Sequence, residues 1–191
     1  IDGVVIKLDD SSMRAAVGAT SHHPRWAIAL KFEPRQGITR IDKIGIQVGR
    51  TGVLTPVAFL RPVVLGGVMV SRASLHNREE LKRKDLREGD TVRIQRAGDV
   101  IPQVVEVVES EGDRQSPFVM PKECPACGAA VYEDGPRTKC PNRFACPAQL
   151  QARIEHFGGR SALDIEGLGE ETAALVVREG LVRSLADLFD L

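Results

Sequence analysis

The chain has few aromatic residues and no net charge. Only 4% of its 191 residues are aromatic, with a single Trp and a single Tyr, so aliphatic side chains must fill any core. Lys and Arg equal Asp and Glu at 26 each, which excludes a uniformly basic or acidic protein. The 191 residues contain no apolar run long enough to span a membrane and no secretory segment. We therefore expect a cytoplasmic protein that does not contact membranes, and we expect a monomer.

The charge is nevertheless uneven along the chain. Residues 35–103 carry thirteen Lys and Arg against seven Asp and Glu, whereas residues 148–191 carry four against eight. The basic segment can face a polyanion. The acidic end cannot do so through the charge of its side chains.

Cysteine is absent except within one short stretch. Two, twelve and five residues separate its four members, Cys124, Cys127, Cys140 and Cys146. A close pair followed by a looser pair is typical of a tetrahedral Zn²⁺ site, because a two-residue spacer lets both sulfurs point at one ion. Structural zinc can supply about 10–16 kcal/mol of folding free energy. Two disulfides or four unrelated buried thiols are the alternatives, and nothing in the sequence indicates the oxidising compartment that disulfides need.

Short β-branched or alternating stretches dominate residues 38–109. One helical stretch, Leu75–Lys84, interrupts them, and Gly and Pro separate them. Five short strands and one helix predict a small barrel of the oligonucleotide-binding (OB) fold; a generic antiparallel sandwich is the alternative. The expected strands are Thr39–Val48, Val53–Leu60, Val68–Arg72, Thr91–Gln95 and Val100–Val108.

Other segments have simpler patterns. Val4–Leu8 and Trp26–Phe32 read as strands, and residues 110–122 read as a linker. After the cysteines the hydrophobic period becomes helical, which predicts helices over Ala148–Phe157 and Glu170–Glu179. Both ends of the chain fall inside expected regular elements, so we expect a piece of a longer protein.

Gly167-Leu168-Gly169 precedes the second of these helices. Two glycines allow a tight turn whose amide N–H groups point outward, beside the partial positive charge of a helix N-terminus. Gly167 and Gly169 could therefore hold a DNA phosphate through the backbone, which would let an acidic region bind DNA. A plain turn between two helices fits the pattern equally well.

Lys7 and Lys31 each end an apolar strand-like run. A lysine at that place can reach into a pocket and neutralise phosphate oxygens, or it can simply be a solvated strand end. Gly3 beside Asp2 would let the backbone approach a ligand, and the Asp2 carboxylate could accept a hydrogen bond or position a divalent ion.

A glycine-flanked turn in the basic segment carries Arg50 and Thr51. A guanidinium and a hydroxyl in such a loop suit a phosphate backbone. Arg96–Pro102 is a second candidate, with a surface Arg–Asp pair as its alternative. The four histidines, His156 among them, have no partner at metal-site spacing, and we expect structural roles for them.

Taken in order, these motifs resemble the bacterial NAD⁺-dependent DNA ligases from end to end of the chain. The order of the motifs is more specific than any one of them. Those that carry the resemblance are Asp2–Lys7 and Pro24–Phe32, similar to nucleotidyltransferase motifs IV and V, then Val48–Gly52, Thr55–Ala58, Leu75–Asn77, Gly89–Asp90, Arg96–Pro102, the four cysteines with Cys146–Gln149, and Asp164–Gly169.

The resemblance implies that the parent protein seals nicks between a 5′-phosphate and a 3′-hydroxyl in duplex DNA during replication and repair. The chemistry it implies passes through enzyme-AMP and DNA-adenylate intermediates, with NAD as cofactor, structural Zn²⁺, and Mg²⁺ in catalysis, with Mn²⁺ as the alternative. Lys7 and Lys31 would then contact the adenylate phosphate with Asp2 in the same pocket. Arg50, Thr51, Gly167 and Gly169 would contact the nicked duplex.

The resemblance also implies an α+β multidomain fragment in four parts. They are the end of the adenylation (nucleotidyltransferase) domain at 1–36, an OB fold at 37–112, a four-cysteine zinc finger at 113–147 and the start of a helix-hairpin-helix domain at 148–191.

The chain departs from the family pattern at one decisive point. The family nucleophile lies in Lys-x-Asp-Gly, and no such tetrapeptide occurs here, so we expect that this chain does not adenylate itself. The rival interpretations are a non-catalytic zinc-containing DNA-binding module and an RNA-joining or capping nucleotidyltransferase. The paired lysine motifs argue against the first, and the zinc finger followed by a hairpin argues against the second.

Overall fold

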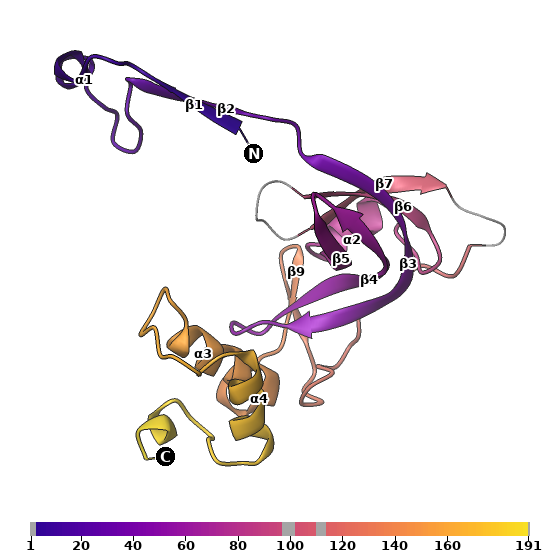
Figure 1. Cartoon of the computed structure of the whole chain (residues 1–191). Helices are drawn as coiled ribbons and strands as arrows, with labels where there is room; N and C mark the ends of the chain where they lie inside the picture. The colour runs from indigo at the N-terminus through magenta and orange to yellow at the C-terminus, as the bar shows by residue number, and fades with distance from the viewer. Residues whose placement is uncertain (1–2, 97–101, 110–113, 191) are drawn as a thin grey trace.

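The computed structural model describes residues 3–96, 102–109 and 114–190. In Figure 1 an N-terminal arm extends from the top of a central barrel, and a helical region lies below the barrel. The elements in chain order are β1 Gly3–Lys7, α1 Ser11–Val17, β2 Ala27–Lys31, β3 Arg35–Val48, β4 Val53–Leu65, β5 Val68–Ser74, α2 Arg78–Arg83, β6 Thr91–Arg96, β7 Gln103–Glu109, β8 Tyr132–Asp134, β9 Arg137–Lys139, a 3₁₀ turn Arg143–Ala145, α3 Pro147–Gly158, α4 Glu170–Arg178 and a 3₁₀ turn Ala186–Phe189.

Strands β3 to β7 form a closed barrel. Their order is β3-β6-β7-β5-β4, and β4 pairs again with β3. All these neighbours are antiparallel except β5 and β7, which run parallel where Ser74 pairs with Gln103. Five strands in this closed order, with α2 between the third and the fourth, make the OB fold. The predicted barrel is confirmed and the alternative antiparallel sandwich is excluded.

The barrel interior is aliphatic, as the low aromatic content predicts. Each buried Leu, Ile or Val contributes roughly 1.5–3 kcal/mol relative to exposure. Phe118, from the segment after the barrel, packs against this core and is partly buried. The buried members are Ile41, Ile44, Ala58, Leu60, Leu65, Val70, Ala73, Leu75, Leu81, Leu86, Val92, Ile94 and Val104.

Helix α2 begins three residues later than the sequence predicts. The Asn77 side chain accepts a 2.9 Å hydrogen bond from the amide of Glu80, which makes Asn77 the N-cap. Leu75 belongs instead to the barrel, because its amide donates to the carbonyl of Pro56 and its side chain is buried in the core. The predicted helix start was therefore wrong by three residues, because Leu75 packs in the barrel core and not in the helix.

The cysteine-containing segment extends the barrel sheet. Hairpin β8–β9 joins the free edge of β4, where Val53 pairs with Lys139 and Leu54 with Thr138. The part of the expected linker that the structure describes is fastened to the barrel. Arg114 in that segment donates hydrogen bonds to the carboxylates of Asp85 and Asp90.

Helices α3 and α4 pack on each other around a separate small core that includes Ile154, Ala173 and Val176. Both lie within one residue of their predicted bounds. Gly158 is the last residue of α3, and the chain around Leu168 passes close to it. A Cβ at position 158 would lie 2.7 Å from the carbonyl oxygen of Leu168, so only glycine fits there. No helix in the described part of the chain is long and apolar enough to cross a membrane.

The N-terminal arm is a two-stranded antiparallel ribbon of β1 and β2, with α1 between them. Helix α1 was not predicted from the sequence; its first turn is capped by the Asp10 carboxylate, which accepts a 2.8 Å hydrogen bond from the amide of Ser12. Among the described residues, none from 3–34 belongs to a buried core cluster. The apolar side chains of Val5, Ile6 and Ile28 are more than half exposed.

Candidate functional site

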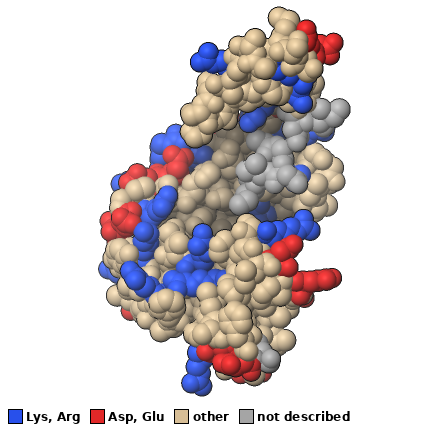
Figure 2. Space-filling model, turned by 90° about the vertical axis from the view of Figure 1, so that its left-hand side faces the viewer, with Lys and Arg blue, Asp and Glu red and all other residues tan. Residues whose placement is uncertain are grey.

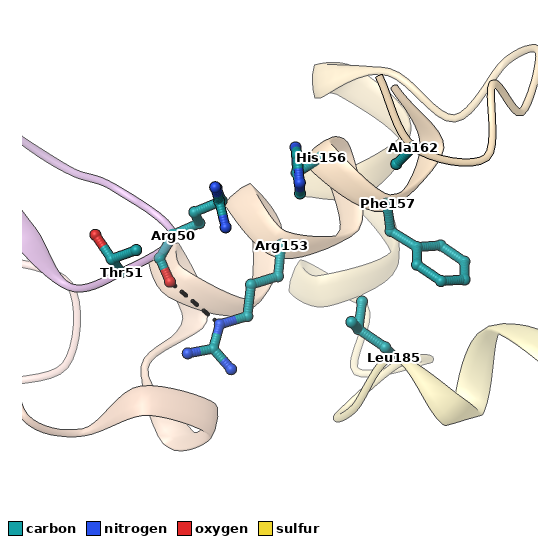
Figure 3. Close-up of a pocket in the computed structure, with 7 residues that line it drawn as sticks. All are labelled: Arg50, Thr51, Arg153, His156, Phe157, Ala162 and Leu185. Carbon is teal, nitrogen blue, oxygen red and sulfur yellow. Dashed lines mark hydrogen bonds between the residues drawn. The ribbon is translucent and has the colours of Figure 1, made fainter. Parts of the chain in front are cut away.

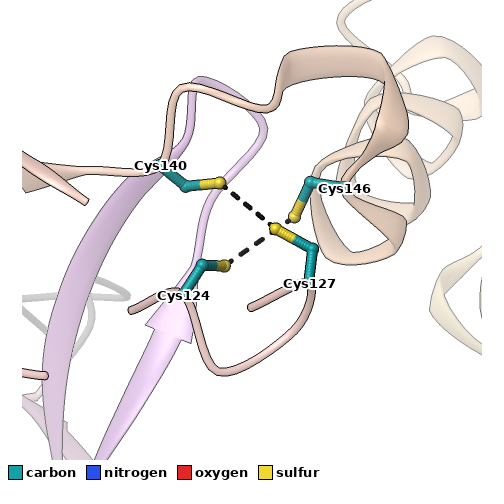
Figure 4. Close-up of side chains that lie close together, drawn as sticks. All are labelled: Cys124, Cys127, Cys140 and Cys146. Atoms are coloured by element: carbon teal, nitrogen blue, oxygen red, sulfur yellow. Dashed lines mark hydrogen bonds between the residues drawn. The ribbon is translucent and has the colours of Figure 1, made fainter. Parts of the chain in front are cut away.

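The four cysteines come together in space. Cys124 and Cys127 lie in the loop before β8, Cys140 follows β9, and Cys146 directly precedes α3. Their Sγ atoms all lie within 4.8 Å of one another, with Cys127–Cys140 at 3.5 Å and Cys124–Cys146 at 3.9 Å (Figure 4). Four sulfurs around one Zn²⁺ at about 2.3 Å would be roughly 3.8 Å apart. The donor set therefore fits zinc.

The two alternatives for these cysteines fail. All four thiols are free, so no disulfide links them. Three of the four are buried beside Val48 and Leu54 of the barrel edge, in a cluster that all four share. They are a single group rather than unrelated core residues.

The thiols differ in acidity. Burial raises the pKa of Cys140 to about 12 and also raises the pKa of Cys146. Burial opposes ionisation of Cys127 too, but hydrogen bonds from the Ala129 amide and the Asn142 side chain outweigh it and lower that pKa to about 7. Thiolates are the metal-binding form, so a cation entering this cluster must displace protons from the buried sulfurs.

The cysteine cluster is anchored to the barrel and to α3. The amide of Cys140 donates a 2.8 Å hydrogen bond to the carbonyl of Gly52. The Gln149 side chain, on α3, is 1% exposed and donates a 3.2 Å bond to the carbonyl of Cys140. Because Cys146 directly precedes α3, three parts of the chain meet at one group of thiols.

Gly52 also closes the turn between β3 and β4. Its amide donates a 2.8 Å bond to the carbonyl of Gly49, which places Arg50 and Thr51 at the two central turn positions. Both side chains are exposed. The turn forms one wall of a depression of about 420 Å³ (Figure 3). The residues that line it are Arg50, Thr51, Arg153, His156, Phe157, Ala162 and Leu185.

Two residues that line this depression were not predicted from the sequence. Arg153 had no predicted role, and His156 had only a structural one, yet both lie on α3 and line the depression (Figure 3). Their spacing of three residues puts them on one face of a helix. The partner surface comes from a turn 103 residues earlier, so no local pattern indicates the pairing.

Lys7 and Lys31 lie on the same face of the ribbon but at its opposite ends. Lys7 pairs with Ala27, and Lys31 pairs with Gly3. Four strand positions separate the two lysines along the ribbon, which corresponds to roughly 13 Å. Both side chains are exposed and have no hydrogen bond or ion pair with a described residue. Asp2 lies outside the described residues, so the structure places only the two lysines.

Gly167 and Gly169 form an exposed hairpin before α4. Gly167 has φ +83°, which favours glycine, and Gly169 is the N-cap without a side-chain cap. The first turn of α4 carries Glu170 and Glu171. Of the second basic candidate, Arg96 and Pro102 are described and the residues between them lie outside the description.

Basic side chains are prominent on the face shown in Figure 2. There Lys and Arg gather across the middle of the molecule, while Asp and Glu lie mainly toward its edges. The upper part of this view is mostly uncharged, with scattered Lys and Arg and one group of Asp and Glu at its edge.

Comparison with known proteins gives matches along the whole chain. Residues 1–35 match the family model described as NAD-dependent DNA ligase adenylation domain, and residues 38–116 match NAD-dependent DNA ligase OB-fold domain. The chain is 53% identical to a DNA ligase of Myxococcus xanthus, 51% to one of Desulfosudis oleivorans and 53% to one of Haloquadratum walsbyi. Each match covers 100% of this chain but only 29%, 28% and 25% of the relative. The chain thus spans between a quarter and a third of the length of these relatives, and it belongs to the NAD-dependent DNA ligase family.

Proposed function

We propose that this chain is the part of an NAD-dependent DNA ligase that holds nicked duplex DNA and contributes phosphate-binding lysines to the adenylation pocket. The parent enzyme joins the 5′-phosphate and 3′-hydroxyl of a nick during DNA replication and repair. The observation that carries this proposal is the exposed turn Arg50–Thr51, which the barrel presents beside two further basic side chains of α3. A rigid cationic turn on an OB barrel suits a nucleic-acid backbone.

The lysines of the ribbon support the adenylation half of the proposal. Each has a free ammonium group on one shared face, and neither is paired with a carboxylate in the described structure. Each could reach a phosphate placed between them, where a point charge offsets the negative oxygens. NAD supplies the adenylyl group in this chemistry. We also propose, from membership of the family, that Asp2 and a catalytic Mg²⁺ or Mn²⁺ act in the same pocket.

The remaining parts have supporting roles in this proposal. Zinc held by Cys124, Cys127, Cys140 and Cys146 is structural and keeps the turn against α3. The hairpin Gly167–Gly169, as the start of a helix-hairpin-helix domain, offers backbone N–H groups to a DNA phosphate. We further propose that the enzyme is a cytoplasmic monomer.

A segment exchange tests the activity. The matching segment of the Myxococcus xanthus ligase is replaced by this chain, and NAD-dependent sealing of a nicked duplex is measured. We expect sealing by the hybrid and a large loss with Lys31→Ala, while Lys122→Ala, an exposed lysine outside the proposed pockets, keeps activity. A folded hybrid that binds nicked DNA but does not seal it would contradict the ligase proposal.

The rival function, a DNA-binding module without catalysis, is separated by the same hybrid. A protein that only binds DNA does not need Lys7 or Lys31. Substituting either lysine would then leave both the sealing rate and the DNA affinity of the hybrid unchanged. The isolated chain, which lacks Lys-x-Asp-Gly, should stay unlabelled with NAD carrying a labelled adenylyl group. Covalent AMP on any of its lysines would show that the nucleophile is misidentified.

A further inference from the structure

One contact in the depression between the barrel and α3 restrains the basic turn. Arg153 Nε donates a 3.2 Å hydrogen bond to the backbone carbonyl of Arg50. The carbon at the centre of the same guanidinium lies 4.5 Å from the centre of the Phe144 ring. The hydrogen bond directs one edge of the guanidinium toward the turn, and the ring covers one of its faces.

The remaining nitrogens of these side chains are available to a ligand. The two terminal nitrogens of Arg153 have no partner among the described residues, and the same holds for the side chains of Arg50 and His156. The lining contains no Asp or Glu. Arg153 and His156 are three residues apart on α3, and both line the depression, with the Arg153 guanidinium beside the backbone of the turn (Figure 3).

The side of the depression away from the turn is apolar. Its lining there is Phe157, Ala162 and Leu185 (Figure 3). A free inorganic anion has no apolar surface that could pack against these side chains. A sugar-phosphate unit of a nucleic-acid strand does, since its phosphate can face the cations while its deoxyribose lies against the apolar side chains. A volume of about 420 Å³ accommodates a group of that size.

We propose that Arg50, Arg153 and His156 form one binding site for a single backbone phosphodiester of duplex DNA, spanning the barrel and α3. Arg153 contacts the phosphate and also positions the Arg50–Thr51 turn through its bond to the Arg50 carbonyl. The site rests on the proposed DNA-binding function and adds residues and a geometry to it. It exists only while α3 is held against the turn, and Gln149 and Cys146 provide that hold.

Binding of the 191-residue chain to a nicked duplex, measured by fluorescence anisotropy over a range of salt concentrations, tests this site. Arg153→Ala should weaken binding about tenfold and reduce the slope of log K against log salt by about 0.9, the value for one phosphate contact. Arg153→Lys keeps the charge but loses the planar contacts, so it should weaken binding while leaving the slope unchanged.

Two further variants keep the test decisive if Arg153→Ala does not fold. The His156 side chain makes no hydrogen bond with a described residue, and His156→Ala should weaken binding about threefold with an unchanged circular dichroism spectrum. Arg178→Ala removes the same charge from α4, outside the depression, and should leave affinity within about twofold of the unsubstituted chain.

The outcomes separate the two levels of the proposal. If the unsubstituted chain binds nicked duplex and the Arg153 and His156 variants behave like Arg178→Ala, the site is wrong and the DNA-binding function stands. If the unsubstituted chain does not bind nicked duplex at all, both the site and the DNA-holding role of this segment are overturned.

Discussion

The carbonyl oxygen of Gly52 accepts a 2.8 Å hydrogen bond from the amide of Cys140. This bond joins a proposed metal ligand to the turn that carries Arg50 and Thr51. The approach is close, because a Cβ added at Gly52 would lie 2.4 Å from the carbonyl oxygen of Cys140 and 3.1 Å from the Gln149 amide nitrogen. The basic turn, the cysteine cluster and α3 therefore form one packed unit.

Replacing Gly52 by Ala should destabilise the chain in two ways, through backbone strain at a positive φ and through the crowding of the added Cβ. Gly52 has φ +81° and is crowded, whereas Gly67 has φ +83° and has nothing within 4 Å of an added Cβ. Gly67→Ala should lower the free energy of unfolding by about 1 kcal/mol through backbone strain alone. Gly52→Ala should lower it by about 3 kcal/mol, since the backbone must also move. Equal losses in urea titrations would show that the turn and the cysteine cluster are not packed as described.

Removing zinc should loosen one part of the chain and leave another intact. The barrel core contains none of the four cysteines, so β3 to β7 should keep slow amide hydrogen exchange when a chelator extracts the metal. The amides of β8, β9 and α3 should exchange faster, because the ion that holds them is gone. Re-addition of Zn²⁺ is the control and should restore protection. Uniform loss of protection across the barrel would contradict this division.

Acid should weaken the same metal site. Burial raises the pKa of Cys140 to about 12, so its proton is held more tightly than that of an ordinary thiol and must be displaced for the metal to bind. Zinc affinity measured by competition with a chromophoric chelator should therefore fall between pH 8 and pH 6. An affinity that does not change with pH would argue against thiolate ligands.

The sequence predicted most elements because their patterns are local. Alternation predicts the strands of the barrel, although Ile41 and Ile44 are three residues apart and both reach the core only because a bulge lies between Ile41 and Lys43. The two-residue spacing brings Cys124 and Cys127 together. The start of α2 was wrong because a tertiary contact decides it. Leu75 reads as a helix residue, but the barrel core and the carbonyl of Pro56 hold it outside the helix.

The candidate site was less accessible to sequence reasoning. Arg50 and Thr51 could be predicted from the glycines around them, whereas Arg153 and His156 have no local signal for their pairing with that turn. The relation between Lys7 and Lys31 depends in the same way on strand register. Alternation within each strand does not reveal that they share a face at opposite ends of the ribbon.

The N-terminal ribbon should be the least protected part of the chain. It packs into no described core cluster, and Val5, Ile6 and Ile28 are more than half exposed. An isolated two-stranded ribbon is marginal in water. Amides of β1 and β2 should therefore exchange with deuterium much faster than those of β3 and β4 in the isolated chain, and should slow in the hybrid ligase. Equal protection of both sheets in the isolated chain would contradict this expectation.

The stability of the barrel should depend on Asp85 in acid. The hydrogen bond from Arg114 is the largest cause that lowers the pKa of Asp85 below 3.8, with Arg87 adding to it and desolvation opposing it. The unfolded chain then binds the proton more readily than the folded one. The stabilising contribution is present above the unfolded pKa and is lost as pH falls through the lower folded value. Asp85→Asn should make the urea midpoint less dependent on pH between about pH 5 and pH 2.

The matched control for this pH dependence is Asp190→Asn. Asp190 is exposed, and its side chain has no hydrogen bond with a described residue, so its replacement should leave the slope of the urea midpoint against pH as it is in the unsubstituted chain. Arg114 connects Asp85 to Asp90, whose side chain is only 3% exposed. Arg114→Ala should therefore flatten the acid limb as Asp85→Asn does, and should also cost about 3 kcal/mol at neutral pH, because it leaves the buried carboxylate of Asp90 without its partner of opposite charge and with only the hydrogen bond from the Arg87 amide. An Arg114→Ala variant with unchanged stability at neutral pH would show that this ion pair does not fasten the segment after β7 to the barrel.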